Sequence, residues 1–255
     1  MSAFGAMVWN GYREARRNRI TTLIGGFAIV LMASSTLVAE VTVMTFQRVS
    51  TDVGLGLMAM IMTVLAIYLA CGMLPGEIER RTIFLVVSRP ISRATFLVAR
   101  LIGNVLTLAI LLAAMTAIFW LQSKYIIFDI GWPVLYAQLG LLTELVVLSA
   151  AGFMFSSMSS AVVSATCTTG LYFMGHLTND LYKIADRSDS AAMKAFGRFI
   201  YYALPNLENL NYRGHATYDI SVDPADFLKT VVYALGYAVV FTVVAMFVFE
   251  RRDFK

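Results

Sequence analysis

The sequence has few charged residues for its length. Only 14% of its 255 residues are Asp, Glu, Lys or Arg, while 59% are hydrophobic and the mean hydropathy is +0.73. A soluble domain is typically about 25% charged, so this chain lacks the polar side chains needed to cover a water-facing surface. The composition therefore excludes an ordinary soluble domain and indicates that lipid is its main solvent.

Cysteine and histidine are also scarce. The two cysteines, Cys71 and Cys167, lie inside long apolar runs, and the two histidines are His176 and His215. We interpret the cysteines as packed thiols rather than a disulfide, and so few histidines exclude a His-rich metal site. His215 is predicted to be an ordinary surface residue. The sequence thus predicts no metal and no cofactor.

Motifs for catalysis are missing as well. The chain contains no His-Glu-x-x-His, no Gly-x-Ser-x-Gly and no Gly-x-x-x-x-Gly-Lys-[Ser/Thr], the last being the loop whose backbone amides hold nucleotide phosphates. We therefore predict that this chain is not an enzyme. If ATP drives its activity, the energy must come from another polypeptide.

Long apolar runs are what the sequence has in abundance. Crossing the hydrocarbon core takes a helix of about 20 apolar residues, and its backbone amides must bond within the segment because lipid offers no partners. We predict an all-α, polytopic membrane protein with six transmembrane helices. They are expected at residues 21–39, 53–74, 101–121, 131–155, 161–179 and 231–249.

The distribution of Lys and Arg predicts the orientation of these spans. An even number of spans places both termini on one side, and that side holds twelve of the 20 basic residues on much less loop sequence. Because short cytoplasmic loops are enriched in Lys and Arg, both termini are predicted to be cytoplasmic, with the protein in the cell inner membrane. The net charge of +4 reflects this bias, so we predict no nucleic-acid partner.

Residues 2–19 precede the first span and are amphipathic. Phe4, Met7 and Tyr12 share one helical stripe, and Arg13 and Arg17 lie opposite. This pattern predicts a helix lying in the plane of the membrane interface. The alternative is an ordinary positively charged flank of the first span.

The densest charge cluster lies between the second and third spans. Pro75 and the glycine after it are predicted to end the second span, and Glu77 and Glu79 then stand near the positive end of a new helix dipole. Pro90 stops that helix, because the residue before a proline is pushed out of the α region. Residues 77–93 are therefore predicted to form a short amphipathic helix and a rigid corner. The alternative is a solvated, positively charged loop.

The outer side holds one long polar segment, residues 180–230. Apolar residues at helical spacing predict a helix at 190–204, lying at the outer membrane surface. Asp223 and Pro224 predict the start of the helix that enters the sixth span. The stretch between them, 206–219, is expected to be irregular and to receive an extracytoplasmic partner or to form a gate lid.

One acid, Glu144, falls near the middle of the fourth span. A carboxylate there costs about 2.5–3.5 kcal/mol on insertion scales, so its side chain is expected to face protein or water. It either lines a translocation path or a dimer seam, or is a protonated acid bonded to a neighbouring hydroxyl or carbonyl. His176 is expected nearer the outer surface, by helical rise, and is not predicted to pair with it.

The link between the second and third spans has the form E-x-E-x-x-T-x-x-x-x-x-S-R-P-I-S-R, and the chain ends on E-R-R-D-F followed by one lysine. Together with the basic N-terminal segment and six spans, this resembles the permease subunits of ABC-2 type transporters over nearly the whole chain. Within that family it is similar to the compact six-span branch that includes the permease of the nitrous-oxide-reductase maturation transporter.

The resemblance implies a dimer, most simply a homodimer, in which each copy binds a separate cytoplasmic ABC ATPase. It also implies that the link 77–93 is the coupling helix that docks on the ATPase. The residues implied to dock are Glu77, Glu79, Arg80, Arg81, Thr82, Arg89, Pro90 and Arg93.

Three functions remain open from the sequence. The first is a permease subunit of an ATP-driven transporter, most simply an exporter. The second is a mechanical subunit of the same machine that transmits motion to an extracytoplasmic partner. The third is an ATP-independent membrane scaffold or carrier. The rigid basic corner favours the first two, and the modest outer segment favours transport. The substrate is not named by the sequence.

Overall fold

The computed structural model describes residues 46–79, 93–126, 131–188 and 190–251, together with residue 5 and residues 26–27, 29–31 and 33–34. Throughout these residues the regular structure is helical, as the sequence predicts. The elements are α3 (Phe46–Glu79), α5 (Arg93–Ile126), α6 (Pro133–Met158), α7 (Ala161–Asp186), α8 (Ala191–Ala203), the 3₁₀ turn η1 (Glu208–Leu210), α9 (Arg213–Thr217) and α10 (Pro224–Arg251).

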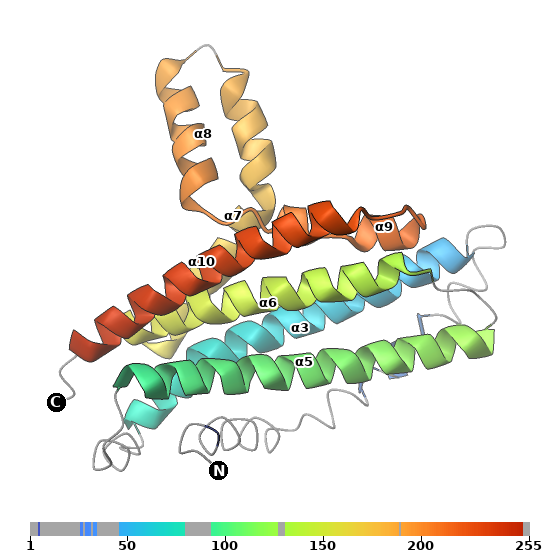
Figure 1. Ribbon diagram of the computed structural model, residues 1–255, viewed down its shortest axis with the longest axis horizontal. Coiled ribbons are helices and arrows are strands. Elements are labelled where there is room, and N and C mark those ends of the chain that lie inside the picture. Colours follow the sequence, from blue (N-terminus) through green and yellow to red (C-terminus); the bar gives the residue numbers. More distant parts are fainter. Residues whose placement is uncertain are drawn as a thin grey trace.

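Four long helices, α3, α5, α6 and α10, run along the longest axis of the molecule (Figure 1). The helix α6 is their centre, because it packs against α3, α5, α7 and α10. Seven consecutive residues of α6, 147–153, are buried. A run of that length covers every face of a helix, so α6 is enclosed on all sides at this level.

Within the described residues the hydrophobic core has two parts that meet on α6. One part joins α3, α5 and α6 around Met58, Met62, Leu111 and Met115, all of them at most 2% exposed. The other part joins α6, α7 and α10 with the start of α5. Unbranched methionines suit such irregular gaps between helices. Packing around one buried helix therefore holds the bundle together.

Four helices in the described residues are long and apolar enough to cross a membrane: Phe46–Gly72, Ala94–Lys124, Pro133–Met158 and Pro224–Arg251. They contain or largely overlap four of the six predicted spans. The predicted fifth span, 161–179, lies inside the helix α7, which is not among these four. The predicted first span, 21–39, lies mostly outside the described residues. The structure thus supports a multi-pass membrane protein and does not confirm the count of six.

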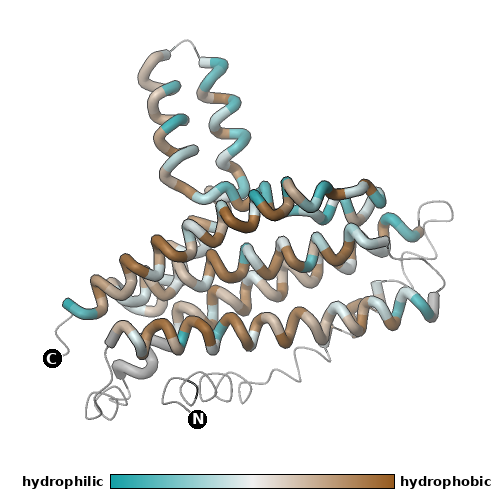
Figure 2. The backbone as a smooth tube through the Cα atoms, viewed as in Figure 1, coloured by the Kyte–Doolittle hydropathy of each residue, from teal (hydrophilic) through white to brown (hydrophobic). Residues whose placement is uncertain are grey.

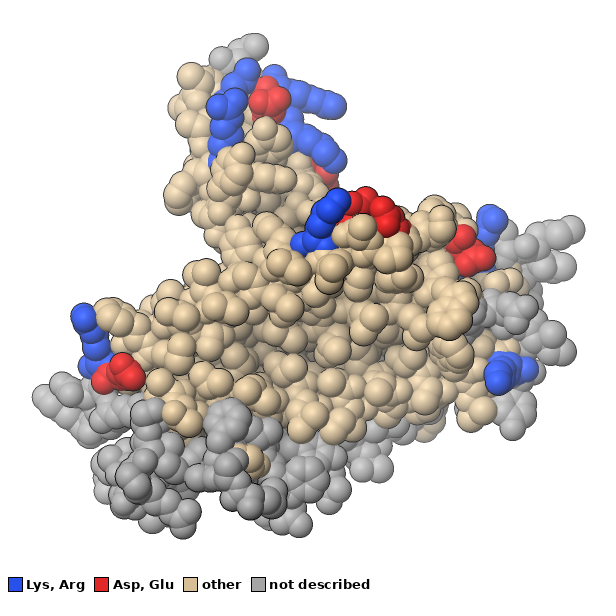
Figure 3. Space-filling view, in the orientation of Figure 1, with Lys and Arg blue, Asp and Glu red and all other residues tan. Residues whose placement is uncertain are grey.

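The surface agrees with a membrane location. Figure 2 shows hydrophobic residues along the long helices and a more mixed composition on the projection formed by the last part of α7 and by α8. On the face shown in Figure 3, charged side chains gather on that projection, beside its base and toward the ends of the bundle, and the broad area between these groups is nearly free of them. An uncharged band between charged ends is typical of a membrane-spanning body.

The predicted helix end at Pro75 is wrong. The helix α3 continues through Pro75 as far as Glu79. A proline removes one backbone donor and strains the preceding turn, but membrane helices tolerate such residues where the freed groups find other partners. The second helix and the beginning of the predicted coupling element are therefore one continuous rod. Residues 80–92, and all of the predicted in-plane helix 2–19 except residue 5, lie outside the described residues.

The predicted outer helix at 190–204 is confirmed as α8, within one residue at each end. It packs along the last part of α7, where Gly197 lies directly against Ala185. The two helices form a hairpin that stands away from the bundle (Figure 1). Its predicted place at the outer membrane surface stays a prediction.

The predicted start of the last helix is confirmed. The helix α10 begins at Pro224, and the backbone N–H of Ala225 donates to Asp223 Oδ1 over 3.0 Å. Asp226 lies in the first turn and accepts a hydrogen bond of 2.7 Å from Lys229 Nζ. The acid before the helix thus satisfies one of the donors that a helix start leaves free.

This cap gives a prediction for stability. Replacing Asp223 by Ala removes the acceptor of the Ala225 N–H, so we expect a loss of about 1 kcal/mol in the free energy of unfolding. Asp223→Asn keeps a side-chain oxygen and serves as the matched control, with a much smaller expected loss. Thermal unfolding of the purified protein in detergent measures both. Equal stability of the Ala and Asn variants would contradict the capping role.

Candidate functional site

The segment between α8 and α10 lies against the bundle because two glycines let it approach closely. A side chain at Gly175 of α7 would collide with the side chain of Leu207, 2.7 Å away, and one at Gly140 of α6 would collide with the carbonyl of Leu210. Leu207 and Leu210 are at most 1% exposed, and the Leu207 N–H donates to the Gly175 carbonyl over 3.1 Å. These contacts fix the turn η1, and with it Glu208, over α6 and α7.

Asparagines fasten the same segment to α7. Asn206 Nδ2 donates to Asn179 Oδ1 over 2.6 Å, and Asn179 Nδ2 donates to Asn209 Oδ1 over 3.4 Å. The Asn206 N–H also donates to the hydroxyl of Tyr233 on α10, at 3.2 Å. The segment was expected to be irregular from the sequence, and it instead contains η1 and α9 held by specific bonds to two long helices.

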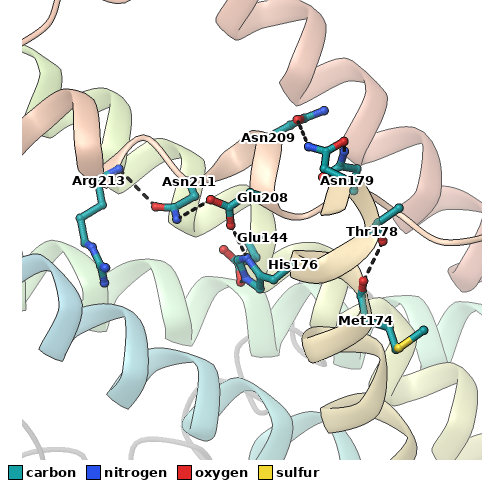
Figure 4. A network of polar contacts seen from close by, with 10 residues as sticks. Glu144, Met174, His176, Thr178, Asn179, Glu208, Asn209, Asn211 and Arg213 are labelled. Carbon is teal, nitrogen blue, oxygen red and sulfur yellow. Dashed lines mark hydrogen bonds and ion pairs between the residues drawn. The ribbon is translucent and has the colours of Figure 1, made fainter. Parts of the chain in front are cut away.

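Three titratable side chains meet beneath this segment (Figure 4). His176 Nε2 lies 3.1 Å from Glu144 Oε1, and His176 Nδ1 lies 2.8 Å from Glu208 Oε2. The Glu144 side chain is 7% exposed, that of His176 is 22% exposed and that of Glu208 is 46% exposed. We call these three residues the carboxylate–imidazole triad. One imidazole therefore bridges a buried and a half-exposed carboxylate.

The pairing of Glu144 with His176 corrects the sequence analysis, which did not expect it. The helices α6 and α7 are antiparallel neighbours joined at Ser159 and Ser160. Glu144 is fourteen residues before the end of α6 at 158, and His176 is fifteen residues after the start of α7 at 161. Counted from this shared turn, the two residues lie at the same level. The sequence alone allowed this count from the turn. The sequence analysis instead judged the two depths from the outer ends of the predicted spans, and this gave the wrong relative position of Glu144 and His176.

Glu208, Asn211 and Arg213 are functional candidates that the sequence analysis missed. Asn211 Nδ2 donates to Glu208 Oε1 over 3.1 Å, and the Arg213 N–H donates to Asn211 Oδ1 over 3.3 Å. Arg213 Nε lies 3.0 Å from Asp52 Oδ1 on α3. A polar network therefore runs from α6 through α7, η1 and α9 to α3. Only the fold brings these residues together, since their positions span most of the chain.

A small hollow of about 80 Å³ adjoins the triad. Gln138 of α6 is 7% exposed and its Nε2 donates to Met58 Sδ over 3.2 Å, while its Oε1 is buried and has no hydrogen-bond donor within the described part of the chain. A buried acceptor without a partner costs about 1–3 kcal/mol, so Gln138 Oε1 is an energetically costly group beside the hollow. The polar side chains around the hollow are Gln138, Glu144, Tyr172, His176, Asn211, Tyr212 and Arg213.

A larger hollow of about 450 Å³ lies between α3 and α7 and shares Ala59, Tyr172 and Arg213 with the small one. Most of its lining is apolar, including Met60, Val64 and Phe173, which are 59–64% exposed. Within the described residues, acids, histidines and cysteines form no group suited to a metal ion. The chemistry available here is proton and hydrogen-bond exchange beside an apolar surface.

The predicted docking residues lie elsewhere. Glu77 and Glu79 belong to the last turn of α3, and Arg93 is the first residue of α5. These helix ends meet the end of α10 and the α6–α7 turn at one end of the bundle (Figure 1). The remaining predicted docking residues, Arg80, Arg81, Thr82, Arg89 and Pro90, lie outside the described residues. His215 lies on α9 beside the ring of Tyr212, and its ring takes no part in the triad.

The burial of Glu144 gives a stability prediction. Replacing it by Leu leaves His176 Nε2 without its partner in a mostly buried position, so we expect a loss of about 1–3 kcal/mol in the free energy of unfolding. Glu144→Gln keeps an oxygen acceptor and is expected to lose less. Asp180→Leu on α7, where the side chain is 67% exposed, is the surface control. Thermal unfolding in detergent compares the three, and a Leu variant as stable as the control would contradict the pairing.

Comparison with known proteins agrees with this membrane body. The model of the ABC-2 family transporter proteins matches residues 6–254, nearly the whole chain. A comparison with curated proteins gives no match. Members of this family are membrane components of transporters, are not themselves catalytic and typically work with an ATPase subunit. Because the match extends over far more than half of the sequence, the chain belongs to the ABC-2 family of transporter proteins.

Proposed function

We propose that this chain is the permease subunit of an ATP-driven exporter of the cell inner membrane. Two copies form the membrane dimer, and each binds a separate cytoplasmic ATPase. The observation that carries the proposal is the family match over residues 6–254. In this arrangement residues 21–39 and α7 supply the first and fifth of six spans, and residues 2–19 lie in the inner interface. The compact six-span branch remains the subfamily that the sequence resembles.

The placement of the helix ends supports a single ATPase-binding face. The end of α3, the start of α5, the α6–α7 turn and the end of α10 share one end of the bundle (Figure 1). The link 77–93 joins two of these ends, so a partner that binds it there can move both helices. Both termini are cytoplasmic in this proposal, because the C-terminal end of α10 lies on the same side as the link.

The long helices are suited to transmit that motion. Each of α3 and α5 has 34 residues and is therefore about 50 Å long at the usual rise per residue. Both pack on α6, and α3 also packs on α7. A displacement at the link therefore reaches the opposite end of the bundle, where Asp52 of α3 binds Arg213.

The translocation path is proposed to follow the α3–α7 side of the bundle. Here the two hollows adjoin each other, and Glu144 lines the smaller one. The exposed apolar side chains of Met60, Val64 and Phe173 on the same side form a surface that a second copy of the chain covers in the dimer. Glu144 then lies next to the seam rather than in contact with lipid, which agrees with the cost of a carboxylate in hydrocarbon.

The hairpin of α7 and α8 favours a second candidate function. It projects away from the bundle (Figure 1), as a docking arm for an extracytoplasmic partner would. In that case the complex transmits motion without a conduit. A transporter reconstituted in liposomes is expected to hydrolyse ATP faster when its substrate is added, whereas a mechanical subunit responds only to the outer partner. An ATP-independent scaffold would not copurify with an ATPase.

Charge reversal tests the docking assignment. The double variant Glu77→Lys and Glu79→Lys is expected to lower ATPase affinity by about tenfold or more, equivalent to ~1.4 kcal/mol, and to uncouple ATP hydrolysis while membrane insertion stays normal. Asp180→Lys with Asp186→Lys reverses two acids on α7 and serves as the control. Copurification of the ATPase and its hydrolysis rate are the measurements. Unchanged binding and activity in the first variant would count against docking at residues 77–93.

A further inference from the structure

We propose that Glu144, His176 and Glu208 form a proton-binding site, and that the bound proton latches α7 to α6 and to the turn η1. The three side chains come from three separate elements and meet at distances of 3.1 Å and 2.8 Å. The site does not depend on the permease function proposed above, because it follows from the hydrogen-bonding capacity of the three groups.

Counting hydrogen atoms shows why a proton is needed. An ionised carboxylate only accepts hydrogen bonds, and a neutral imidazole carries one N–H. Both ring nitrogens of His176 face a carboxylate oxygen, so a neutral ring with two ionised acids satisfies only one of the two contacts. One further proton, on the ring or on a carboxyl, satisfies both. Proton binding from water changes the charge of the triad from −2 to −1, and release reverses it.

Side-chain exposure provides a path for that proton. Exposure falls from 46% at Glu208 through 22% at His176 to 7% at Glu144. Glu208 is therefore in contact with solvent. Glu144, at the opposite end of the triad, is buried on α6 and lines the small hollow. The ring of Tyr172 meets the His176 ring edge to face at 4.7 Å, which holds the imidazole between the two acids. A fully buried ion pair could not exchange protons this way.

Two ion pairs lie on the elements around the triad. Arg213 of α9 is paired with Asp52 of α3 at 3.0 Å, and Asp180 of α7 with Lys183 at 3.5 Å. Further titratable side chains on these elements include Tyr136 on α6, Tyr172, Tyr182 and Asp186 on α7, Tyr212 and His215 beside and on α9, and Tyr233 on α10. No ion pair in the described residues joins Glu144 or Glu208 to a Lys or Arg, so binding a proton is how the triad lowers its charge.

The proton has a structural consequence. When it is lost, a ring nitrogen and a carboxylate that both lack a hydrogen face each other, and one contact opens. The turn η1 leads through Asn211 to Arg213, which binds Asp52 of α3. Protonation therefore determines how firmly the segment from η1 to α9 joins α7 to α3. The end of the bundle opposite the predicted ATPase face is thus sensitive to the proton concentration on its own side.

The histidine count makes the site directly measurable. The chain has two histidines, so imidazole ¹⁵N labelling of the full-length protein in detergent gives two sets of signals, and His215→Asn leaves that of His176 alone. We expect both nitrogens of His176 to be protonated at the acidic end of the titration, with one lost as pH rises. Glu144→Gln and Glu208→Gln are each expected to move that midpoint by about one pH unit or more.

Asp180→Asn is the matched control, because it neutralises an acid one turn away that does not touch the ring; its expected shift is a few tenths of a pH unit at most. A second measurement tests whether the bound proton holds the turn η1 against α7. The Leu207 N–H, bonded to Gly175, is expected to exchange with solvent about tenfold faster above the midpoint, after correction for the intrinsic pH dependence of exchange.

Three outcomes would overturn the proposal. His176 could keep one protonation state from about pH 5 to pH 9, which would mean that the triad neither binds nor releases a proton in this range. The midpoint could stay unmoved in Glu208→Gln, a variant at a half-exposed position that leaves the core intact. Protection of the Leu207 amide could be the same above and below the midpoint, which would remove the latch. The experiment uses no ATPase and no substrate, so its failure and the failure of the permease proposal are distinguishable.

Discussion

The absence of water in the hydrocarbon core is the constraint on which this structure depends. Backbone amides that leave water must bond within their own segment, so the apolar runs of this chain form long helices. The constraint acts most strongly on the helix α6, because neighbouring helices surround it and seven of its consecutive residues are buried. The bundle is then held by close packing of apolar side chains, since lipid gives little drive for helices to associate. A polar side chain on α6 is therefore costly unless it finds a partner inside the protein.

Glu144, Gln138 and the residues around them show how that requirement leads to a site. Glu144 finds its partner in His176, and the segment above it supplies Glu208 to the other ring nitrogen. The close approach of this segment requires glycine at 140 and 175. The short segment between α8 and α10 thus covers part of the bundle and connects α3, α6, α7 and α10. The site and the connection between helices are one set of contacts.

Much of the framework was predictable from local patterns. Apolar runs predicted four of the long helices, and the spacing of apolar residues predicted α8 within one residue at each end. Asp223 and Pro224 predicted the start of α10, because capping chemistry is local. Pro75 led to a wrong prediction. A proline locally favours the end of a helix, but here the surrounding fold overrides that preference and α3 continues to Glu79. The first span, the in-plane helix and most of the coupling link concern residues beyond the described part of the chain.

The sequence by itself determined that the chain is a helical membrane protein, that it has no nucleotide-binding loop, and that Glu144 must face protein or water, because composition, motifs and burial costs act residue by residue. Only the tertiary structure decided which groups Glu144 would meet. Glu208 and Arg213 carry no local signal, and their roles depend on a turn that lies over α6 and α7. Contacts between residues far apart in the chain are set by how helices pack, and packing is a property of the whole fold.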